Sequence, residues 1–419
     1  MIVDTHLKGE IIMTSNKSHG AHRILLIRPA VAKVPRSRNI MRRIYTNLLS
    51  IALFLFVVPT ALASTTWYVD GVNGNDSNNC QTPETACKAI GRAISLAGSG
   101  DSIIVAPAIY TENLTITFSL NLIGSGANTT ILDGGGVKRV INISTGNVTL
   151  SDLTVRNGAA NPGYGGIGGG IYNAGNLFIS ASTISGNVAS ALCPPSPCTG
   201  GGGGIYNSGK LTISMSTIAA NTAEAGCVYS QHMPCVSTAH GGGIFNRGTM
   251  ILSNSTIAAN TARHIANGFA FQNVGGIVNI GNAMISNSTI SGNNPNGIAN
   301  NQGFSVTLQN SIVSNNAGSN CSSGMVSNGY NLSSDGTCTF NSRGDLNNHD
   351  PLLGPLQNNG GPTQTMALLP GSPAIDGGNP AGCTDGLGNL LKTDQRGMPR
   401  PDKEDTGGCD MGAYESQSD

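Results

Sequence analysis

The chain has 419 residues, of which 58 are glycine and only 11% are charged. So low a charged fraction excludes a disordered acidic or basic tail, and no basic patch indicates nucleic-acid binding. Residues 1–63 hold nine of the 22 basic residues and two of the 22 acidic residues, so residues 64–419 carry a net charge of −7. A mildly acidic chain of this kind does not favour anionic polymers as partners.

Residues 41–63 have the features of a secretory signal peptide. The segment opens with basic residues, continues with an apolar run over residues 48–58 and ends in Ala-Leu-Ala. The apolar run is shorter than the roughly 20 residues that a membrane-spanning helix needs. We therefore expect residues 1–40 to be a non-native or disordered extension before the true start. Residues 64–419 are then the secreted or outer-surface chain of a bacterium, without a transmembrane segment.

Residues 64–102 are expected to form an N-terminal cap. A strand begins near Trp67, a loop follows, and a short amphipathic helix is predicted over residues 87–96. Such a helix covers the open end of a solenoid and so prevents edge-to-edge aggregation.

Residues 103–319 repeat one sequence pattern. Three copies are GGGIYNAGNLFISASTISGN from Gly168, GGGIYNSGKLTISMSTIAAN from Gly202 and GGGIFNRGTMILSNSTIAAN from Gly241. Within each copy aliphatic and polar residues alternate, and glycine or asparagine interrupts the pattern, as in short strands joined by turns. Repeats of this period predict a solenoid, here an all-β parallel β-helix in which strands of successive coils lie about 4.8 Å apart.

Two series of asparagines recur at equivalent places in the repeats. Because asparagine suits both turns and stacked amide hydrogen bonds, each series is expected to form a ladder. The first series is Asn173, Asn207, Asn246 and Asn279, followed by Asn300, and the second is Asn187, Asn221, Asn260 and Asn293, followed by Asn316.

The repeat period varies because segments are inserted at one place in each repeat. The surplus residues, near 191–201, 225–240 and 264–274, would therefore project from the same edge of the solenoid. Insertions on one face of a solenoid often form its binding face. The alternative is that they are tolerated surface loops.

Ten cysteines follow the leader, an even number that indicates disulfides in a secreted protein. They lie in sequence-local pairs, although the sequence alone does not fix their connectivity. A zinc site is the alternative, but no pair has CxxC spacing and no histidine cluster accompanies one. The predicted pairs are Cys80–Cys87, Cys193–Cys198, Cys227–Cys235, Cys321–Cys338 and Cys383–Cys409.

One repeat copy also matches the glycine–lysine spacing of a phosphate-binding loop. Lys210 follows Gly204 and Gly209 at that spacing, but Leu211 stands where the loop needs a magnesium-binding serine or threonine. The other copies carry different residues near the position of Lys210. The sequence therefore predicts no nucleotide site.

The N-terminal part resembles a known family of secreted proteins. The stretch WYVDG from Trp67 and the segment SLNLIGSGANTTILDG, Ser119–Gly134, resemble the start of proteins of the pectin-lyase-like right-handed β-helix class. The repeats and their STISGN tails are similar to those of the chlamydial polymorphic outer membrane proteins. The resemblance implies that the predicted parallel β-helix is right-handed.

The C-terminal third resembles the bacterial choice-of-anchor Q domain. The similar stretches are Cys321–Cys338, Asp350–Gly378 and Asp394–Glu415. The resemblance implies a small loop-rich domain over residues 320–419 in a surface or secreted protein. Family members carry C-terminal sorting signals, whereas no hydrophobic anchor follows Glu415 here. The mode of attachment is therefore open, with release from the cell as one outcome.

Polysaccharide cleavage is the main enzymatic alternative. A hydrolase needs paired carboxylates, and a lyase needs a cationic base and usually calcium. The solenoid holds few acidic residues, and they do not occupy equivalent places in consecutive coils. The weak catalytic candidates are Asp133, Lys138, Arg139, Asp152 and Arg156, for which ordinary surface charge is the other interpretation.

Acidic residues among glycines in the C-terminal third are weak candidates for a structural calcium site. They include Asp376, Asp385 and Asp394, and none fits the EF-hand spacing. No other cofactor is expected.

The sequence thus favours a non-catalytic protein of adhesion or carbohydrate interaction. The alternatives are a polysaccharide lyase or glycoside hydrolase, and a structural component of the envelope. The expected partner is a polysaccharide or a host or cell-surface molecule, and neither a nucleic acid nor a nucleotide. We expect the protein to be a monomer.

Overall fold

The computed structural model describes residues 64–160, 166–193, 198–227, 236–265, 269–270, 273–322, 324–403 and 408–417. They belong to one compact unit, Ala63–Asp419. The predicted leader extension 1–40 and signal peptide 41–63 lie outside the described residues. Across these described ranges no helix is both long and apolar enough to span a membrane.

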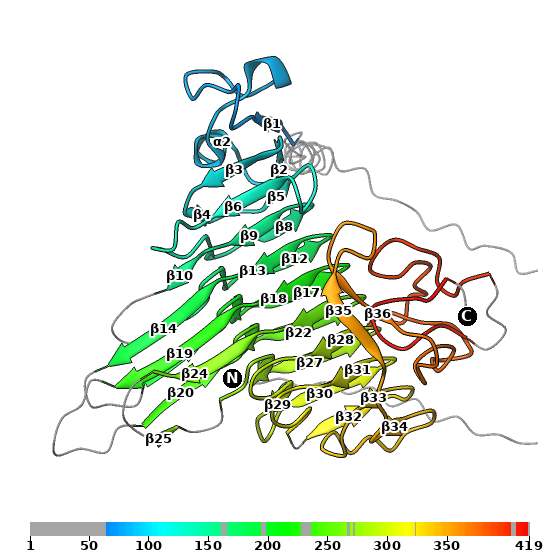
Figure 1. Cartoon of the computed structure of the whole chain (residues 1–419). Helices are drawn as coiled ribbons and strands as arrows, with labels where there is room; N and C mark the ends of the chain where they lie inside the picture. The colour runs from blue at the N-terminus through cyan, green and yellow to red at the C-terminus, as the bar shows by residue number, and fades with distance from the viewer. Residues whose placement is uncertain are drawn as a thin grey trace, which may run out of the picture. The chain divides into compact units, whose positions relative to one another are not determined.

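The protein is a right-handed parallel β-helix, as the sequence predicted (Figure 1). Each full coil adds one strand to each of three parallel sheets, called A, B and C. Sheet A contains β1 Thr66–Val69, β2 Asp101–Val105, β5 Leu120–Ile123, β8 Asn147–Ser151, β12 Asn176–Ser180, β17 Lys210–Ser214, β22 Thr249–Ser253, β27 Asn282–Ser286, β30 Ser305–Gln309 and β32 Met325–Ser327.

Sheets B and C complete the coils. Sheet B contains β3 Ala108–Thr111, β6 Thr130–Asp133, β9 Thr154–Arg156, β13 Thr183–Ser185, β18 Thr217–Ala219, β23 Thr256–Ala258, β28 Thr289–Ser291, β31 Ile312–Ser314, β33 Leu332–Ser333 and β34 Leu346–Asn347. Sheet C contains β4 Leu114–Ile116, β7 Ile141–Ile143, β11 Ile171–Asn173, β16 Ile205–Asn207, β21 Ile244–Asn246, β26 Ile277–Asn279 and β29 Ile298–Asn300.

Aliphatic residues fill the interior because the strand register places like residues above like residues. In sheet A, Ile179 pairs with Ile213, and the same column continues through Leu252 and Ile285 to Leu308. All five side chains are fully buried. Removing such columns from water is the main force that holds the coils together.

Both predicted asparagine series form hydrogen-bonded ladders. In the first, Asn173 Nδ2 donates to Asn207 Oδ1 at 2.7 Å, and the same bond recurs from each coil to the next as far as Asn300. In the second, Asn187 Nδ2 donates to Asn221 Oδ1 at 2.9 Å, and the series continues to Asn316. Each amide supplies one donor and one acceptor, so these buried groups satisfy one another along the stack.

An interior serine series, absent from the sequence predictions, lies at the turn between sheets A and B. Each backbone N–H donates to the hydroxyl oxygen of the equivalent serine in the next coil: Ser182 N donates to Ser216 Oγ at 3.2 Å, and the pattern repeats through the stack. Its members are Ser182, Ser216, Ser255, Ser288 and Ser311, all fully buried.

The N-terminal end is covered by helix α2, Ile90–Leu96, which follows the 3-10 turn η1, Pro83–Thr85. The helix starts later than the predicted residue 87, because the Asp76 carboxylate holds the backbone N–H groups just before it. Glu112 then accepts hydrogen bonds from the first two backbone N–H groups of the helix at 2.8 Å. Ile90 and Ala93 are fully buried in the core.

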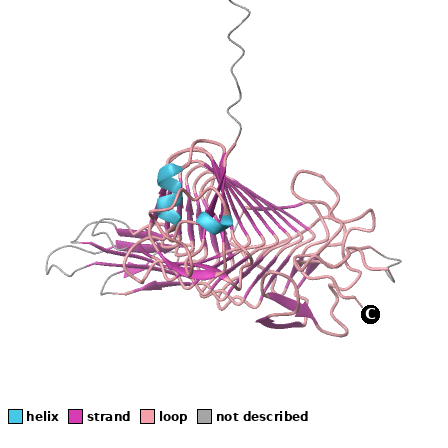
Figure 2. Cartoon of the chain, turned by 90° about the horizontal axis from the view of Figure 1, so that it is seen from above, coloured by secondary structure: helices cyan, strands magenta, loops and turns pink. Residues whose placement is uncertain are grey.

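The inserted segments form two further parallel sheets, where surface loops were one interpretation. Sheet D contains β10 Ala159–Ala160, β14 Val188–Cys193, β19 Thr222–Cys227 and β24 Thr261–His264, and sheet E contains β15 Cys198–Gly201, β20 Val236–His240 and β25 Phe269–Ala270. We call sheets D and E together the wing. Buried alanines such as Ala191, Ala223 and Ala239 lie between its layers, so the layers are close together. Figure 2 shows the wing on one side of the coils and the C-terminal loops on the other.

Residues 351–417, called the C-terminal segment, contain the antiparallel hairpin of β35 Leu353–Gln357 and β36 Thr365–Leu368. The segment covers part of sheet B and the adjoining turns. Thr217 Oγ1 donates to the Gln364 carbonyl, and Thr256 Oγ1 donates to Gln395 Oε1. Strands β32, β33 and β34, before this segment, extend sheets A and B.

Four of the five predicted disulfides are present: Cys80–Cys87, Cys193–Cys198, Cys321–Cys338 and Cys383–Cys409. The predicted pair Cys227–Cys235 lies outside the described residues, because Cys235 is not among them. The Cys321–Cys338 disulfide and Phe340 pack against the last coils as part of the main core. This cluster closes the C-terminal end of the solenoid.

Candidate functional site

The five charged residues proposed from the sequence as a weak catalytic cluster lie at three different places. Asp133 and Arg156 end neighbouring strands of sheet B and form an ion pair of 2.9 Å. Asp152 lies at the turn between sheets A and B, with a φ of 56°. Lys138 and Arg139 precede strand β7 of sheet C. The carboxylates thus belong to sheet B and to the turn before it, whereas Lys138 and Arg139 lie at the start of sheet C.

Asp133 has a structural role at the end of its strand. Its carboxylate accepts hydrogen bonds from the Gly135 N–H and from Asn157 Nδ2, each at 2.9 Å, in addition to Arg156. Burial disfavours the charged carboxylate, but these three hydrogen bonds outweigh it and lower the pKa of Asp133. The ionised group thus closes the turn after β6.

Lys138 and Arg139 line an open cleft of about 470 Å³ above the first strands of sheet C. We call it the sheet C cleft. Its polar lining residues are Asn113, Thr115, Lys138, Arg139 and Asn142, and its apolar ones are Leu114, Val137, Ala159 and Ala160. Among these described lining residues none is acidic.

Backbone carbonyl groups fix the Arg139 side chain in the sheet C cleft. Nε donates to the Gly168 carbonyl at 2.8 Å, and Nη2 donates to the Ile167 carbonyl at 2.7 Å. The guanidinium carbon lies 5.0 Å from the centre of the Tyr172 ring, within the range of a cation–π contact. The neighbouring Lys138 is exposed, so its ammonium group is available to a ligand.

A column of aromatic side chains continues from the sheet C cleft along the outer face of sheet C. The strand register places Asn142, Tyr172, Tyr206 and Phe245 in successive coils. Tyr172 and Tyr206 are stacked with ring centres 5.2 Å apart, and Phe245 meets Tyr206 edge to face at 5.4 Å. Tyr172 is half-buried, whereas Tyr206 and Phe245 are buried.

The wing covers the inner part of this aromatic column. His240 of β20 lies with its ring 5.0 Å from Phe245, and a Cβ added to Gly201 of β15 would lie 2.5 Å from the Phe245 ring. Burial, together with the charge of Arg247, lowers the pKa of His240 to about 4. The imidazole of His240 is therefore neutral at pH 7. The positive charge of the sheet C cleft comes from Lys138 and Arg139.

The sequence holds a signal for this column that its analysis did not use. Tyr172, Tyr206 and Phe245 each follow the Gly-Gly-Ile of a repeat copy. Because the isoleucine faces inward, the next residue of the strand must face outward.

The three calcium candidates lie in the C-terminal segment, where Asp385 and Asp394 already have partners within the protein. Asp385 accepts hydrogen bonds from the backbone N–H groups of Leu387 and Asn389, both at 2.8 Å. Asp394 forms an ion pair of 2.8 Å with Arg396, and Asp376 lies in a turn with a φ of 53°. In the part of the chain that the structure describes, no three His, Cys, Asp or Glu side chains are grouped as a metal site would require.

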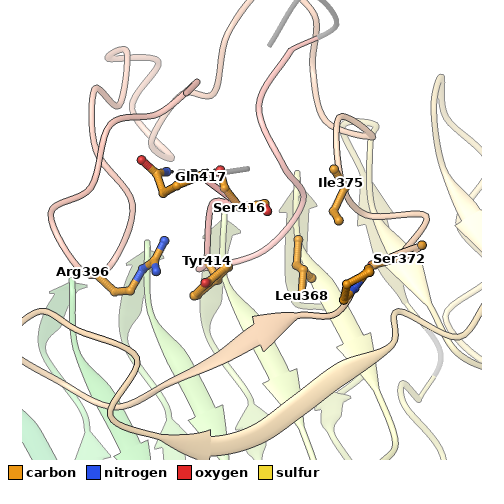
Figure 3. A pocket seen from close by; sticks show the side chains of 9 residues that line it. Leu368, Ser372, Ile375, Arg396, Tyr414, Ser416 and Gln417 are labelled. Carbon is orange, nitrogen blue, oxygen red and sulfur yellow. Dashed lines mark hydrogen bonds between the residues drawn. The ribbon is translucent and has the colours of Figure 1, made fainter. Parts of the chain in front are cut away.

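A second cavity, of about 520 Å³, lies within the C-terminal segment (Figure 3). Leu368 and Ile375 form its apolar wall, and Tyr414, Arg396 and Gln417 lie opposite or beside them. No sequence motif had indicated this cavity.

No protein-family model and no curated protein matches the chain. Similar solved structures include the pectate lyase Pel9A, with 15% identity over 85% of this chain and 97% of that chain, at a TM-score of 0.40. A pectin methylesterase from carrot has 11% identity, covering 59% of this chain and 83% of its own, at 0.30. One from Erwinia chrysanthemi has 13% identity, with coverages of 57% and 81%, at 0.26. At these values the similarity does not extend to activity.

Proposed function

We propose that the protein is a non-catalytic carbohydrate-binding protein, secreted or displayed on the cell surface, with the sheet C cleft as its binding site. The observation that carries the proposal is the lining of this cleft. It combines two cations with three uncharged polar side chains, and its described residues include no carboxylate. The disulfides support an oxidising, extracellular location.

The parts of the sheet C cleft match the parts of an acidic sugar. The exposed Lys138 ammonium can meet a carboxylate or sulfate, while Asn113 and Asn142 can exchange hydrogen bonds with hydroxyl groups. Tyr172 lies between Tyr206 and the Arg139 guanidinium, so it helps to hold the Arg139 charge in the cleft. The local positive charge of the cleft outweighs the overall negative charge of residues 64–419 at this place.

A polysaccharide lyase is the second candidate function. Lys138 and Arg139 lie in one cleft, and the neutral form of a lysine or arginine side chain can act as the base that removes a proton in a lyase. A glycoside hydrolase is less well supported, because hydrolysis needs two carboxyl groups at the cleaved bond and the cleft lining lacks them among its described residues. The proposed surface or secreted location also draws on the sequence resemblance to the choice-of-anchor Q domain and to the polymorphic membrane proteins.

The test is to incubate purified residues 64–419 with acidic and neutral oligosaccharides, with and without calcium. We expect retention of an acidic oligosaccharide and no new chain ends. Lys138→Ala should lower the affinity roughly ten-fold, since it removes a charged contact. Lys210→Ala is the matched control, because Lys210 is also exposed but lies at the start of β17 in sheet A.

If new chain ends form and their formation depends on Lys138, the non-catalytic proposal is wrong and the protein is a lyase. Binding that Lys138→Ala and Lys210→Ala reduce equally would contradict the assignment of the sheet C cleft.

A further inference from the structure

The cavity in the C-terminal segment differs from the sheet C cleft in its charge. Its only charged lining residue is Arg396, whose side chain is 5% exposed, and the described lining contains no acidic residue and no lysine. Arg396 Nε pairs with Asp394, which is fully buried, at 2.8 Å. The charge of the guanidinium is therefore compensated within the protein, and the cavity presents a neutral surface to a ligand.

The aromatic ring in this cavity is rigidly supported. The Arg396 guanidinium lies 3.6 Å from the centre of the Tyr414 ring, and Nη2 also donates to the Glu415 carbonyl. Asp394 holds the same assembly from below, since it accepts hydrogen bonds from the backbone N–H groups of Arg396 at 2.8 Å and Glu415 at 3.0 Å. A ring fixed in this way loses little conformational freedom when a ligand stacks on it.

Polar groups lie beside the apolar wall. The Gln417 amide is held near the rim by donating to the Pro399 carbonyl at 3.1 Å, and Ser372 is a further lining residue. Figure 3 shows Leu368 and Ile375 on one side of the space, and Tyr414 and Arg396 nearer the other. The cavity volume of about 520 Å³ lies in the range of small-molecule sites.

We propose that this cavity binds one neutral sugar ring. A pyranose has an apolar face of C–H groups, which suits Tyr414, Leu368 and Ile375, and a rim of hydroxyl groups, which suits Gln417 and Ser372. A uronic acid is excluded because no uncompensated cation would balance its carboxylate when water is removed. The site is independent of the sheet C cleft, which lies on sheet C and is proposed to bind an acidic sugar rather than a neutral one.

The test measures binding of methyl hexopyranosides and of N-acetylglucosamine to the purified protein by ligand-observed NMR and calorimetry. Glucuronate and galacturonate are the acidic comparators. We expect saturable binding of at least one neutral probe and none of the acidic ones. A neutral oligosaccharide that ends in the same sugar distinguishes a free monosaccharide ligand from the end of a glycan.

Two variants locate the bound sugar. Ile375→Trp should fill the cavity and reduce the affinity roughly ten-fold or more, and Gln417→Ala at the rim should weaken it a few-fold. Leu390→Trp is the matched control, because Leu390 lies in the same segment, outside the cavity lining, and is 63% exposed. Thermal unfolding checks that each variant is folded, and Gln417→Ala alone decides if Ile375→Trp does not fold.

The proposal is overturned if no neutral probe binds, if the uronic acids bind as well, or if both cavity variants keep full affinity. Lys138→Ala should leave this binding unchanged. It therefore separates failure of this site from failure of the sheet C cleft.

Discussion

The wing and the C-terminal segment flank the same coils but are attached to them in different ways. The wing continues the coils as parallel strands, in which Val188 pairs with Thr222 and Thr222 with Thr261, and small residues fill the space between its layers. The C-terminal segment crosses coils and is fastened by individual side chains, such as Asn254 and Asn287, that contact its backbone. The wing is therefore attached by strand pairing, whereas the C-terminal segment is attached by side chains of the turns and of sheet B.

This difference predicts which substitutions lower the free energy of unfolding most in each region. In the wing, the buried residues between the layers are small, mostly alanine and glycine, so side-chain volume is the sensitive quantity. In the C-terminal segment, buried ionic and polar groups are the sensitive ones, because a lost partner leaves the other group unsatisfied.

The largest effect is expected at the buried contact between Arg400 and Glu415 in the C-terminal segment. Arg400 and Glu415 have fully buried side chains and lie 2.6 Å apart, and Arg400 also donates to Asn254 Oδ1. Arg400→Ala should lower the free energy of unfolding by about 3–5 kcal/mol, measured by urea denaturation. The matched wing variant is Arg263→Ala, since Arg263 pairs with Glu224 but is 62% exposed, and it should cost less than about 1 kcal/mol. Equal losses would break the contrast between the two regions.

Volume in the wing should give the next largest effect. A Cβ added to Gly200 of β15 would lie 2.0 Å from the Glu224 carbonyl oxygen of β19, so Gly200→Ala must push the two layers apart. We expect a loss of about 1–3 kcal/mol in the free energy of unfolding. Gly98→Ala is the control, because its added Cβ would be 3.7 Å from the nearest atom. If Gly200→Ala had the same free energy of unfolding as the wild type, the layers would not be tightly packed.

The next effect concerns Asn287, a turn residue whose side chain holds the C-terminal segment on the coils. Asn287 has a φ of 46° and donates to the Thr384 carbonyl at 2.6 Å. Asn287→Ala should cost about 1–2 kcal/mol, because the Thr384 carbonyl loses its donor. Ala181 occupies the same turn in an earlier coil with a φ of 47°, so alanine itself tolerates this backbone. The reverse change, Ala181→Asn, should hardly alter the thermal midpoint, and a large change there would point to the backbone as the cause.

The last expected effect is a dependence of the free energy of unfolding on pH. Burial raises the pKa of Glu415 to about 8, and the charge of Arg400 only partly opposes it. The folded state therefore keeps a proton that the unfolded chain releases near the ordinary pKa of 4.5. Stability from this group is complete below 4.5 and is lost progressively as the pH rises to about 8.

Glu415→Gln tests that pH dependence, because the amide has nearly the same shape and does not ionise. Urea denaturation between pH 5 and 8 should show the slope in the wild type and a smaller slope in the variant. Identical slopes would assign the pH dependence to other groups.

The sequence predicted the repeated part of the fold well, because repetition makes the register visible. Once Ile179, Ile213 and Leu252 are aligned, the inward columns and both asparagine ladders follow. The wing was harder to predict, since its strands are rich in alanine and glycine, which carry a weak strand signal. The packing of the C-terminal segment could not be predicted, because contacts such as that of Thr217 with Gln364 join residues 147 positions apart.

The candidate site was predicted only in part. Nearness in sequence grouped Asp133 with Lys138, but the chain turns from sheet B into sheet C between them, and a sequence does not give the side of the coil that each residue occupies. Asp133 and Arg156 do meet, since they are one coil apart in the same register. The neutral cavity combines Leu368 with Tyr414, and no local pattern in the sequence connects these two residues.

The asparagine ladders have a consequence for how such a protein changes length. Every amide donates in the same direction along the chain, from Asn173 to Asn207 and onward to Asn300. A duplicated or deleted coil would bring one donor and one acceptor with it and leave the rest of the series intact. A single substitution, in contrast, would divide the series in two. The whole coil is thus the natural unit by which the gene for this protein can grow or shrink.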